Sequence, residues 1–351
     1  PDLDVFIQYA NDLDTMTFHR SWTHSWIVHS LLAPLVALLM SKLDKRLNFR
    51  RWLALIWLVW ITHSGLDAMT VYGTQLFWPF MPPPASIGSI FIIDPLYSLP
   101  LAAGFLGILL AAGKRLSHAV MLGSLIFSTT YLGWSYAAQY WITQQTEQAL
   151  QDQQIDYQHI KITPAPLNTL LWRIVVVDED VYYEGFRSIF DGDTAFSFTQ
   201  FDRGMELKKL LPEQTYIERI NWFTQDNFKL GQLDNMLVAT DLRMGMELIE
   251  VSDLVGDSEF KVFAKPATSD DCRVAALCVP GGNALTRQQI DAYTEFAKES
   301  GAAGLAYIKV NEMDTGREGL QSPIVKFLSD VALSGILSRT EASAGDLIFF
   351  G

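Results

Sequence analysis

The sequence predicts a multi-domain protein: an α-helical membrane domain of about four spans, a small mainly-β soluble domain and a C-terminal α+β domain. The chain has 351 residues, a length sufficient for two or three domains, and 49% of them are hydrophobic. Its charge is uneven, because residues 1–142 hold eight Lys/Arg and seven Asp/Glu whereas residues 143–351 hold 18 and 32. Long apolar segments also give way to short alternating ones. We therefore expect domains over residues 1–145, 146–245 and 246–351.

Four apolar segments predict the membrane spans: Trp26–Met40, Trp52–Thr62, Ile90–Ala112 and Ala119–Ile142. A helix needs about 20 residues to cross a bilayer, so the first two must gain length from polar flanks at the interface. The loops at residues 42–51 and 113–118 hold seven of the eight basic residues, and the positive-inside rule makes them cytoplasmic. Residues 1–25, 63–89 and everything after 143 then lie outside. The pattern predicts a multi-pass bacterial inner-membrane protein, embedded in bilayer lipid, with a periplasmic tail.

Histidines and carboxylates gather on the predicted outer side. The motifs PDLD, HRSWTHS, HSGLD and FIIDPLY supply Asp2, Asp4, His19, His24, His63, Asp67 and Asp94. His63 and Asp67 are four residues apart, so a helix would place them on one face. Neutral imidazoles and carboxylates are the ligands of zinc and other divalent metals. The topology brings these residues to one membrane level, which predicts a metal site at the outer rim.

Each rim residue also has a structural interpretation. A histidine near a helix end is commonly an interfacial side chain, and Asp2 and Asp4 can begin a solvated loop. Asp94 precedes Pro95, and Asp is a favoured N-cap while Pro favours the first helical turn. For Asp94, capping and ligation both stay open at this point.

The same residues resemble a family of bacterial membrane-bound metal-dependent hydrolases, whose activity is itself inferred. The resemblance rests on PDLD (1–4), FHRSWTHS (18–25), HSGLDAMTVYGTQLFWPF (63–80), DPLYSLPLAAG (94–104), PAPLNTLLWRIVVVDEDVYYEGFRSIFD (164–191) and LVATDLRMG (237–245). It implies metal binding by His19, His24, His63 and Asp67, with Asp2 and Asp4 as the family's acidic pair. It also implies a further apolar segment upstream, so we expect a truncated N-terminus.

These observations predict an integral membrane hydrolase in which metal-activated water attacks an ester, phosphoester or amide at the outer membrane face. Asp2 is expected as a further ligand, and Asp4 and Asp94 as the catalytic candidates for general base. Zinc is favoured, with manganese or magnesium as alternatives. Location alone suggests a lipid or envelope-derived substrate. The alternative is a membrane scaffold whose rim groups are only interfacial.

The residues after the last apolar segment predict a soluble β-rich tail. Residues 168–201 alternate apolar and polar, with turn residues between the runs, which is typical of a β-meander. Residues 212–225 have helical spacing, and a hairpin is expected to turn at Asp234–Asn235. We expect this tail to lie above the metal rim.

From about Met246 the sequence resembles the GAD domain, the insertion domain of bacterial-type aspartyl-tRNA synthetase. The matching motifs are FKVFAKPA (260–267), RVAALCVPGGNALTRQQID (273–291), GAAGLAYIKV (301–310), GLQSPIVKFLSD (319–330) and GDLIFFG (345–351). The pattern predicts strands at 273–279, 303–310 and 346–350 and a helix at 286–299. The synthetase's ATP- and aspartate-binding motifs are absent, so no aminoacylation is expected. A net charge of −13 gives no support to tRNA as a partner.

One short stretch, DLRMG (241–245), fits the end of the first resemblance and the beginning of the second. The predicted topology puts the tail outside the cell, whereas tRNA charging is cytoplasmic. Our hypothesis is that two genes were joined here, by recombination, construction or sequence assembly. The alternative is a working fusion in which a non-catalytic, tRNA-associated module is tethered to the membrane.

Overall fold

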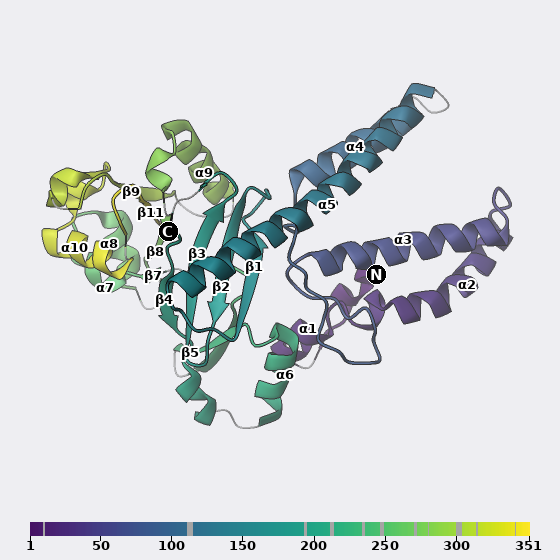
Figure 1. Cartoon of the computed structure of the whole chain (residues 1–351), viewed down its shortest axis with the longest axis horizontal. Helices are drawn as coiled ribbons and strands as arrows, with labels where there is room; N and C mark the ends of the chain where they lie inside the picture. The colour runs from purple at the N-terminus through teal and green to yellow at the C-terminus, as the bar shows by residue number, and fades with distance from the viewer. Residues whose placement is uncertain are drawn as a thin grey trace. The chain divides into compact units, whose positions relative to one another are not determined.

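The computed structural model describes residues 1–9, 11–110, 115–192, 195–210, 214–233, 236–245, 249–269, 272–279, 281–299, 304–313, 315–340 and 342–351 (Figure 1). The chain divides into two compact units, Pro1–Met244 and Gly245–Gly351.

The first unit begins with helices: η1 (Asp2–Phe6), α1 (Asp12–Phe18), η2 (Trp22–His24), α2 (Trp26–Leu43), α3 (Phe49–Met69), α4 (Pro95–Leu110) and α5 (Arg115–Asp152). Helices α2 and α3 pack as an antiparallel pair, and so do α4 and α5 (Figure 1). Polar caps fix where α2 and α3 begin, because Ser25 and Asn48 accept hydrogen bonds from the first free backbone N–H groups. The short helices η1 and η2 and the C-terminal end of α3 carry five of the predicted site residues: Asp2, Asp4, His24, His63 and Asp67.

The expectation of about four spans is confirmed only in part. Within the described residues, α2 with 18 residues and α3 with 21 are long and apolar enough to cross a membrane. Helix α4 has 16 residues and contains Pro100, and residues 111–112 of the predicted segment lie outside the described part. Helix α5 is long enough, with 38 residues, but the side it packs on α4 carries Ser124 and Ser128, which lower its hydropathy. The small residues at this seam, Gly104 included, let the two helices approach closely.

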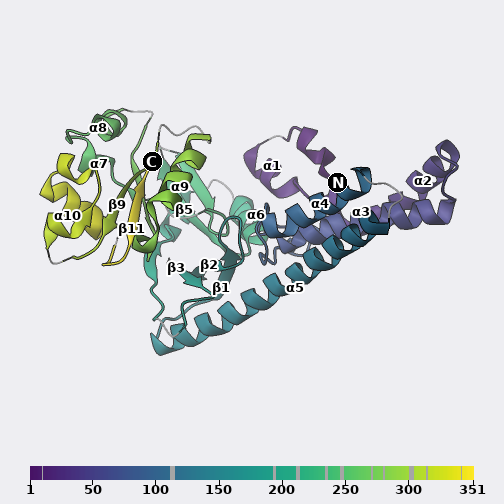
Figure 2. The same cartoon turned by 90° about the horizontal axis from the view of Figure 1, so that it is seen from above.

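An antiparallel sheet follows in the order β1-β2-β3-β4, as the predicted meander requires. Its strands are His159–Pro164, Leu171–Val177, Val181–Ser188 and Thr199–Asp202. The C-terminal part of α5 packs on this sheet (Figure 2), and their shared core contains Ala138, Ile142, Leu150, Ile162, Trp172, Ile174 and Val176. One long helix therefore joins the apolar helices to the β-rich part.

The rest of the first unit is η3 (Met205–Leu210), α6 (Gln214–Thr224) and the hairpin of β5 (Phe228–Leu233) and β6 (Met236–Asp241). Helix α6 corresponds to the helix expected over 212–225. The predicted hairpin turn at residues 234–235 lies outside the described residues.

The second unit is α+β, with a sheet in the order β10-β9-β11-β8-β7. Its elements are β7 (Ile249–Glu250), α7 (Ser252–Val255), α8 (Lys261–Ala267), β8 (Ala275–Val279), η4 (Gly282–Ala284), α9 (Arg287–Glu299), β9 (Ala306–Val310), η5 (Gly316–Gly319), β10 (Leu320–Gln321), η6 (Val325–Phe327), α10 (Asp330–Arg339) and β11 (Leu347–Phe350). Successive side chains of the central strand β11 face opposite sides, so Ile348 and Phe350 join the core with α8 and α10 while Leu347 and Phe349 pack with Ile290 of α9. The predicted strands and helix are present where described.

Candidate metal centre

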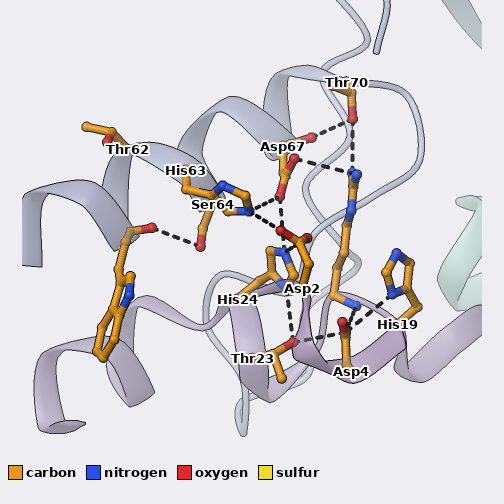
Figure 3. A network of polar contacts seen from close by, with 12 residues as sticks. Asp2, Asp4, His19, Thr23, His24, Thr62, His63, Ser64, Asp67 and Thr70 are labelled. Atoms are coloured by element: carbon orange, nitrogen blue, oxygen red, sulfur yellow. Dashed lines mark hydrogen bonds and ion pairs between the residues drawn. The ribbon is translucent and has the colours of Figure 1, made fainter. Parts of the chain in front are cut away.

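Four of the predicted ligands converge where α2 begins and α3 ends. Asp2 comes from η1, His24 from the end of η2, and His63 and Asp67 from successive turns of α3 (Figure 3). One ligand atom from each residue lies within 4.8 Å of every other. Residues from three elements are therefore gathered around one point.

The separations are those of ligands around a single ion. His24 Nε2 lies 3.3 Å from Asp2 Oδ1 and 3.1 Å from Asp67 Oδ2. His63 Nε2 lies 3.3 Å from Asp2 Oδ2 and 3.3 Å from Asp67 Oδ2. Zinc–ligand bonds of 2.0–2.2 Å in a tetrahedron place neighbouring ligand atoms about 3.4 Å apart. The observed separations are therefore close to those around a tetrahedral zinc ion, with the two imidazoles facing different oxygens of Asp2.

The donor atoms also lack other partners. His24 Nε2, His63 Nε2 and Asp67 Oδ2 are buried and make no hydrogen bond. Buried polar atoms are nearly always paired, because leaving one unpaired costs about 1–3 kcal/mol. A divalent cation would pair all three together. The residues present therefore fit the metal that the sequence predicts.

The surroundings of Asp2 favour its ionised carboxylate form. Burial opposes ionisation of this carboxyl, but the positive charges that His63 and His24 carry when protonated, together with the chain's amino terminus, outweigh that cost and hold the pKa of Asp2 below its usual value. Asp2 is thus supplied as a carboxylate, the form that binds a cation.

Arg20 is a residue of this site to which the sequence assigned no role. Its NH2 lies 3.5 Å from Asp67 Oδ1, its NH1 donates to Thr70 Oγ1 at 3.3 Å, and its guanidinium covers the ring of Tyr72. Burial raises the pKa of Tyr72 to about 12, so its hydroxyl keeps its proton and donates to the Met16 carbonyl. Arg20 therefore orients the far oxygen of Asp67. The HR pair within HRSWTHS was the available signal, but spacing alone does not distinguish it from a surface arginine.

Asp4 and His19 lie beside the four ligands and do not join them. Asp4 is buried, and its Oδ2 accepts hydrogen bonds from the Arg20 backbone N–H at 2.8 Å and from the Thr23 hydroxyl at 2.9 Å. His19 Nδ1 lies 3.3 Å from the same oxygen. The ligand role of His19 and the catalytic role of Asp4 stay predictions, because the contacts of both side chains are directed to this neighbouring network.

Asp94 is placed as a helix cap. Its Oδ1 accepts from the backbone N–H groups of Leu96 and Tyr97 at 2.9 and 3.3 Å, at the start of α4. Its Oδ2 accepts from the Tyr131 hydroxyl of α5 at 2.8 Å, and that hydroxyl lies 3.1 Å from Thr169 Oγ1. Both oxygens are engaged in structural contacts, and Asp94 is not part of the four-residue cluster. Of the two interpretations left open, capping is the one observed, and the catalytic role stays a prediction.

Comparison with known families separates the two parts of the chain. Residues 1–142 match the family described as YdjM inner membrane protein. Residues 263–351 match the family described as GAD domain. Both resemblances predicted from the sequence are confirmed over these residues. All four clustered ligands lie inside the YdjM match, and the match ends within α5.

Proposed function

We propose that the first unit is an integral membrane hydrolase that uses a divalent metal ion held by Asp2, His24, His63 and Asp67. The observation that carries the proposal is the convergence of four ligand atoms, of which His24 Nε2, His63 Nε2 and Asp67 Oδ2 are buried without a hydrogen-bond partner. The YdjM match supports the membrane location. Two imidazoles and two carboxylates favour zinc, with manganese or magnesium as alternatives.

The burial of the ligands sets the direction from which substrate approaches. The His24 side chain is fully buried and that of Asp67 is 15% exposed, whereas His63 is 37% and Asp2 57% exposed. His24 and Asp67 therefore form the closed side of the site, and Asp2 and His63 border the open one. A bound ion supplies Lewis-acid activation of water for attack on an ester, phosphoester or amide. Asp2, next to the open side, contributes negative charge that favours the cation.

The surroundings of Asp2 favour a membrane-associated substrate at the outer face. Leu3, Val5 and Phe6 of η1 follow Asp2 directly and are 73%, 65% and 82% exposed. Exposed apolar side chains beside a polar site suit an amphiphile whose polar group reaches the metal. Together with the loop charges, this supports a lipid or envelope-derived substrate in the periplasmic leaflet of the inner membrane.

Metal analysis of the purified full chain tests the proposal. Wild-type protein should hold one divalent ion per chain, whereas His63→Ala and Asp67→Ala should lose it. His159→Ala, which removes a histidine of β1 outside the cluster, is the matched control and should retain the ion. His19→Ala decides the predicted ligand role of His19. Wild-type protein without stoichiometric metal, or full retention by both cluster variants, would overturn the proposal.

We further propose that the GAD-like unit takes no part in this chemistry and that the two parts were joined within DLRMG (241–245). The boundary in the chain between the two compact units falls between Met244 and Gly245, inside that stretch. Amplification across the join from source genomic DNA tests this. A single product carrying both flanking sequences in one frame would establish a natural fusion instead.

A further inference from the structure

Both histidines of the proposed metal site follow a threonine, and only Thr23 hydrogen-bonds its histidine. Thr23 Oγ1 lies 3.0 Å from His24 Nδ1, and it also donates to Asp4 Oδ2 at 2.9 Å. Thr62 precedes His63, but its hydroxyl donates to the Leu58 carbonyl of its own helix at 2.7 Å. In Figure 3 the Thr62 side chain lies apart from the His63 ring. The two Thr-His pairs thus look alike in sequence and differ in structure.

The direction of these hydrogen bonds fixes where the proton of His24 lies. A threonine hydroxyl has one proton, and an ionised carboxylate can only accept. Because Thr23 gives its proton to Asp4, the hydroxyl oxygen can only accept from His24. Nδ1 therefore carries the imidazole proton, and Nε2 presents a lone pair. That atom faces Asp2 Oδ1 and Asp67 Oδ2 at 3.3 and 3.1 Å.

We propose that Asp4 and Thr23 are positioning residues that hold His24 in its Nδ1–H form, so that its Nε2 is ready to bind the metal. The inference rests on the proposed metal site. Asp4, Thr23 and His24 are 2%, 6% and 0% exposed, so water competes little with these hydrogen bonds. The Arg20 backbone N–H anchors the same Asp4 oxygen from the other side. His24 is therefore the preorganised ligand of the pair, whereas among the described residues no side-chain hydrogen bond fixes the tautomer of His63.

Three single substitutions at the two threonines test the inference. Thr23→Val removes the hydroxyl with little change of shape, Thr23→Ser keeps a hydroxyl, and Thr62→Val is the matched control at the other Thr-His pair. Loss of a hydrogen-bond partner behind a metal-ligating histidine typically lowers metal affinity by about 10–100-fold. We expect that loss for Thr23→Val in zinc competition with a chelator. Thr23→Ser and Thr62→Val should stay within about threefold of wild type.

A second measurement separates this inference from the metal proposal. The ¹⁵N shifts of histidine rings in the metal-free full chain report which nitrogen is protonated, and His24→Gln assigns the His24 signals. Wild type should show His24 protonated at Nδ1, and Thr23→Val should show a mixture or the other form. Equal zinc affinity of Thr23→Val and wild type would overturn the inference and leave the metal site standing. If wild type binds no zinc, the metal proposal fails, and the ring shifts alone decide whether Asp4 and Thr23 hold His24.

Discussion

The candidate metal site of the first unit and the core of the second unit differ in what they bury. The first buries polar atoms without hydrogen-bond partners, and the second buries mainly apolar side chains. At the rim, five buried polar atoms lack a hydrogen-bond partner: Asp4 Oδ1, Arg20 Nε, His24 Nε2, His63 Nε2 and Asp67 Oδ2. Among the described residues of Gly245–Gly351 no buried side-chain polar atom is left unpaired. That unit is instead organised around apolar clusters on both faces of its sheet, the larger of which includes residues from its strands and its helices. Further unpaired atoms lie elsewhere in the described part of the first unit, so unpaired polar atoms distinguish the two units, whereas convergence at ligand spacing distinguishes the candidate site.

The largest stability effect is expected in the second unit. Phe350→Ala removes a 1% exposed ring of the central strand that packs against Phe263 with ring centroids 5.3 Å apart. Such a cavity should destabilise this unit by about 3–5 kcal/mol. Hydrogen exchange of the full chain, read by mass spectrometry, should show lost protection in residues 245–351. Zinc content should not change, and a loss of zinc would mean that the two regions are not independent.

Lys161 is a buried cation of the first unit that lies outside the candidate metal site, and its cost to stability can be measured. Its ammonium donates to the Ser86 carbonyl, and burial, followed by the nearby Arg243, lowers the pKa of Lys161 from 10.5 to about 8. Between those values the unfolded chain binds this proton more tightly than the folded one. The free energy of unfolding should therefore rise as pH increases from about 8 to 10.5, by at most about 3 kcal/mol.

Thermal unfolding midpoints of wild type and Lys161→Met across that pH range measure the Lys161 effect. The rise should be present in wild type and absent or much smaller in the variant. Parallel pH profiles for the two proteins would mean that the Lys161 ammonium is solvated.

Local patterns predicted much of the fold. The apolar helices and the strands and helix of the GAD-like unit follow from hydropathy and periodicity, which depend on neighbouring residues. The predicted number of spans was confirmed only for α2 and α3, because the Pro100 and serine content of α4 and α5 is compatible with packing of these helices against each other as well as with lipid. The sequence could not show that α5 continues past the apolar segment and packs on the β-sheet, since that depends on contacts between distant residues.

The sequence predicted which residues gather near one end of the apolar helices, but not how their side chains are oriented. Asp2, His24, His63 and Asp67 were found because ionisable residues beside apolar segments are rare and costly. Depth does not determine the direction of a side chain, however. His19 ends α1 with its ring beside Asp4, and Arg20 brings its guanidinium to Asp67. These side-chain orientations depend on rotamers and packing, which cannot be predicted from the spacing of residues in the sequence.

The rim itself should respond weakly in stability when a ligand is lost. His63→Ala removes an unpartnered buried nitrogen, so metal-free variant and metal-free wild type should differ by no more than about 1 kcal/mol. With zinc present the wild type should gain stability that the variant lacks, because ligand binding stabilises only the folded state. Thermal midpoints with and without zinc provide the measurement. A large destabilisation of the metal-free variant would show that His63 serves the fold.

The smallest effect is expected at the surface of the second unit. Arg339 donates through two nitrogens to the carboxylate of Asp253, and these hydrogen bonds lower the pKa of Asp253 below its usual value. Both side chains are largely solvent-exposed, at 40% and 62%, so water and salt screen the pair. Asp253→Asn should cost only a few tenths of a kcal/mol at neutral pH, and the difference from wild type should vanish as pH falls through the pKa of Asp253. Thermal unfolding midpoints of Asp253→Asn and wild type in low and high salt measure this difference. A loss of stability comparable to that of Phe350→Ala would mean that charge pairs, and not the apolar cluster, hold this unit together.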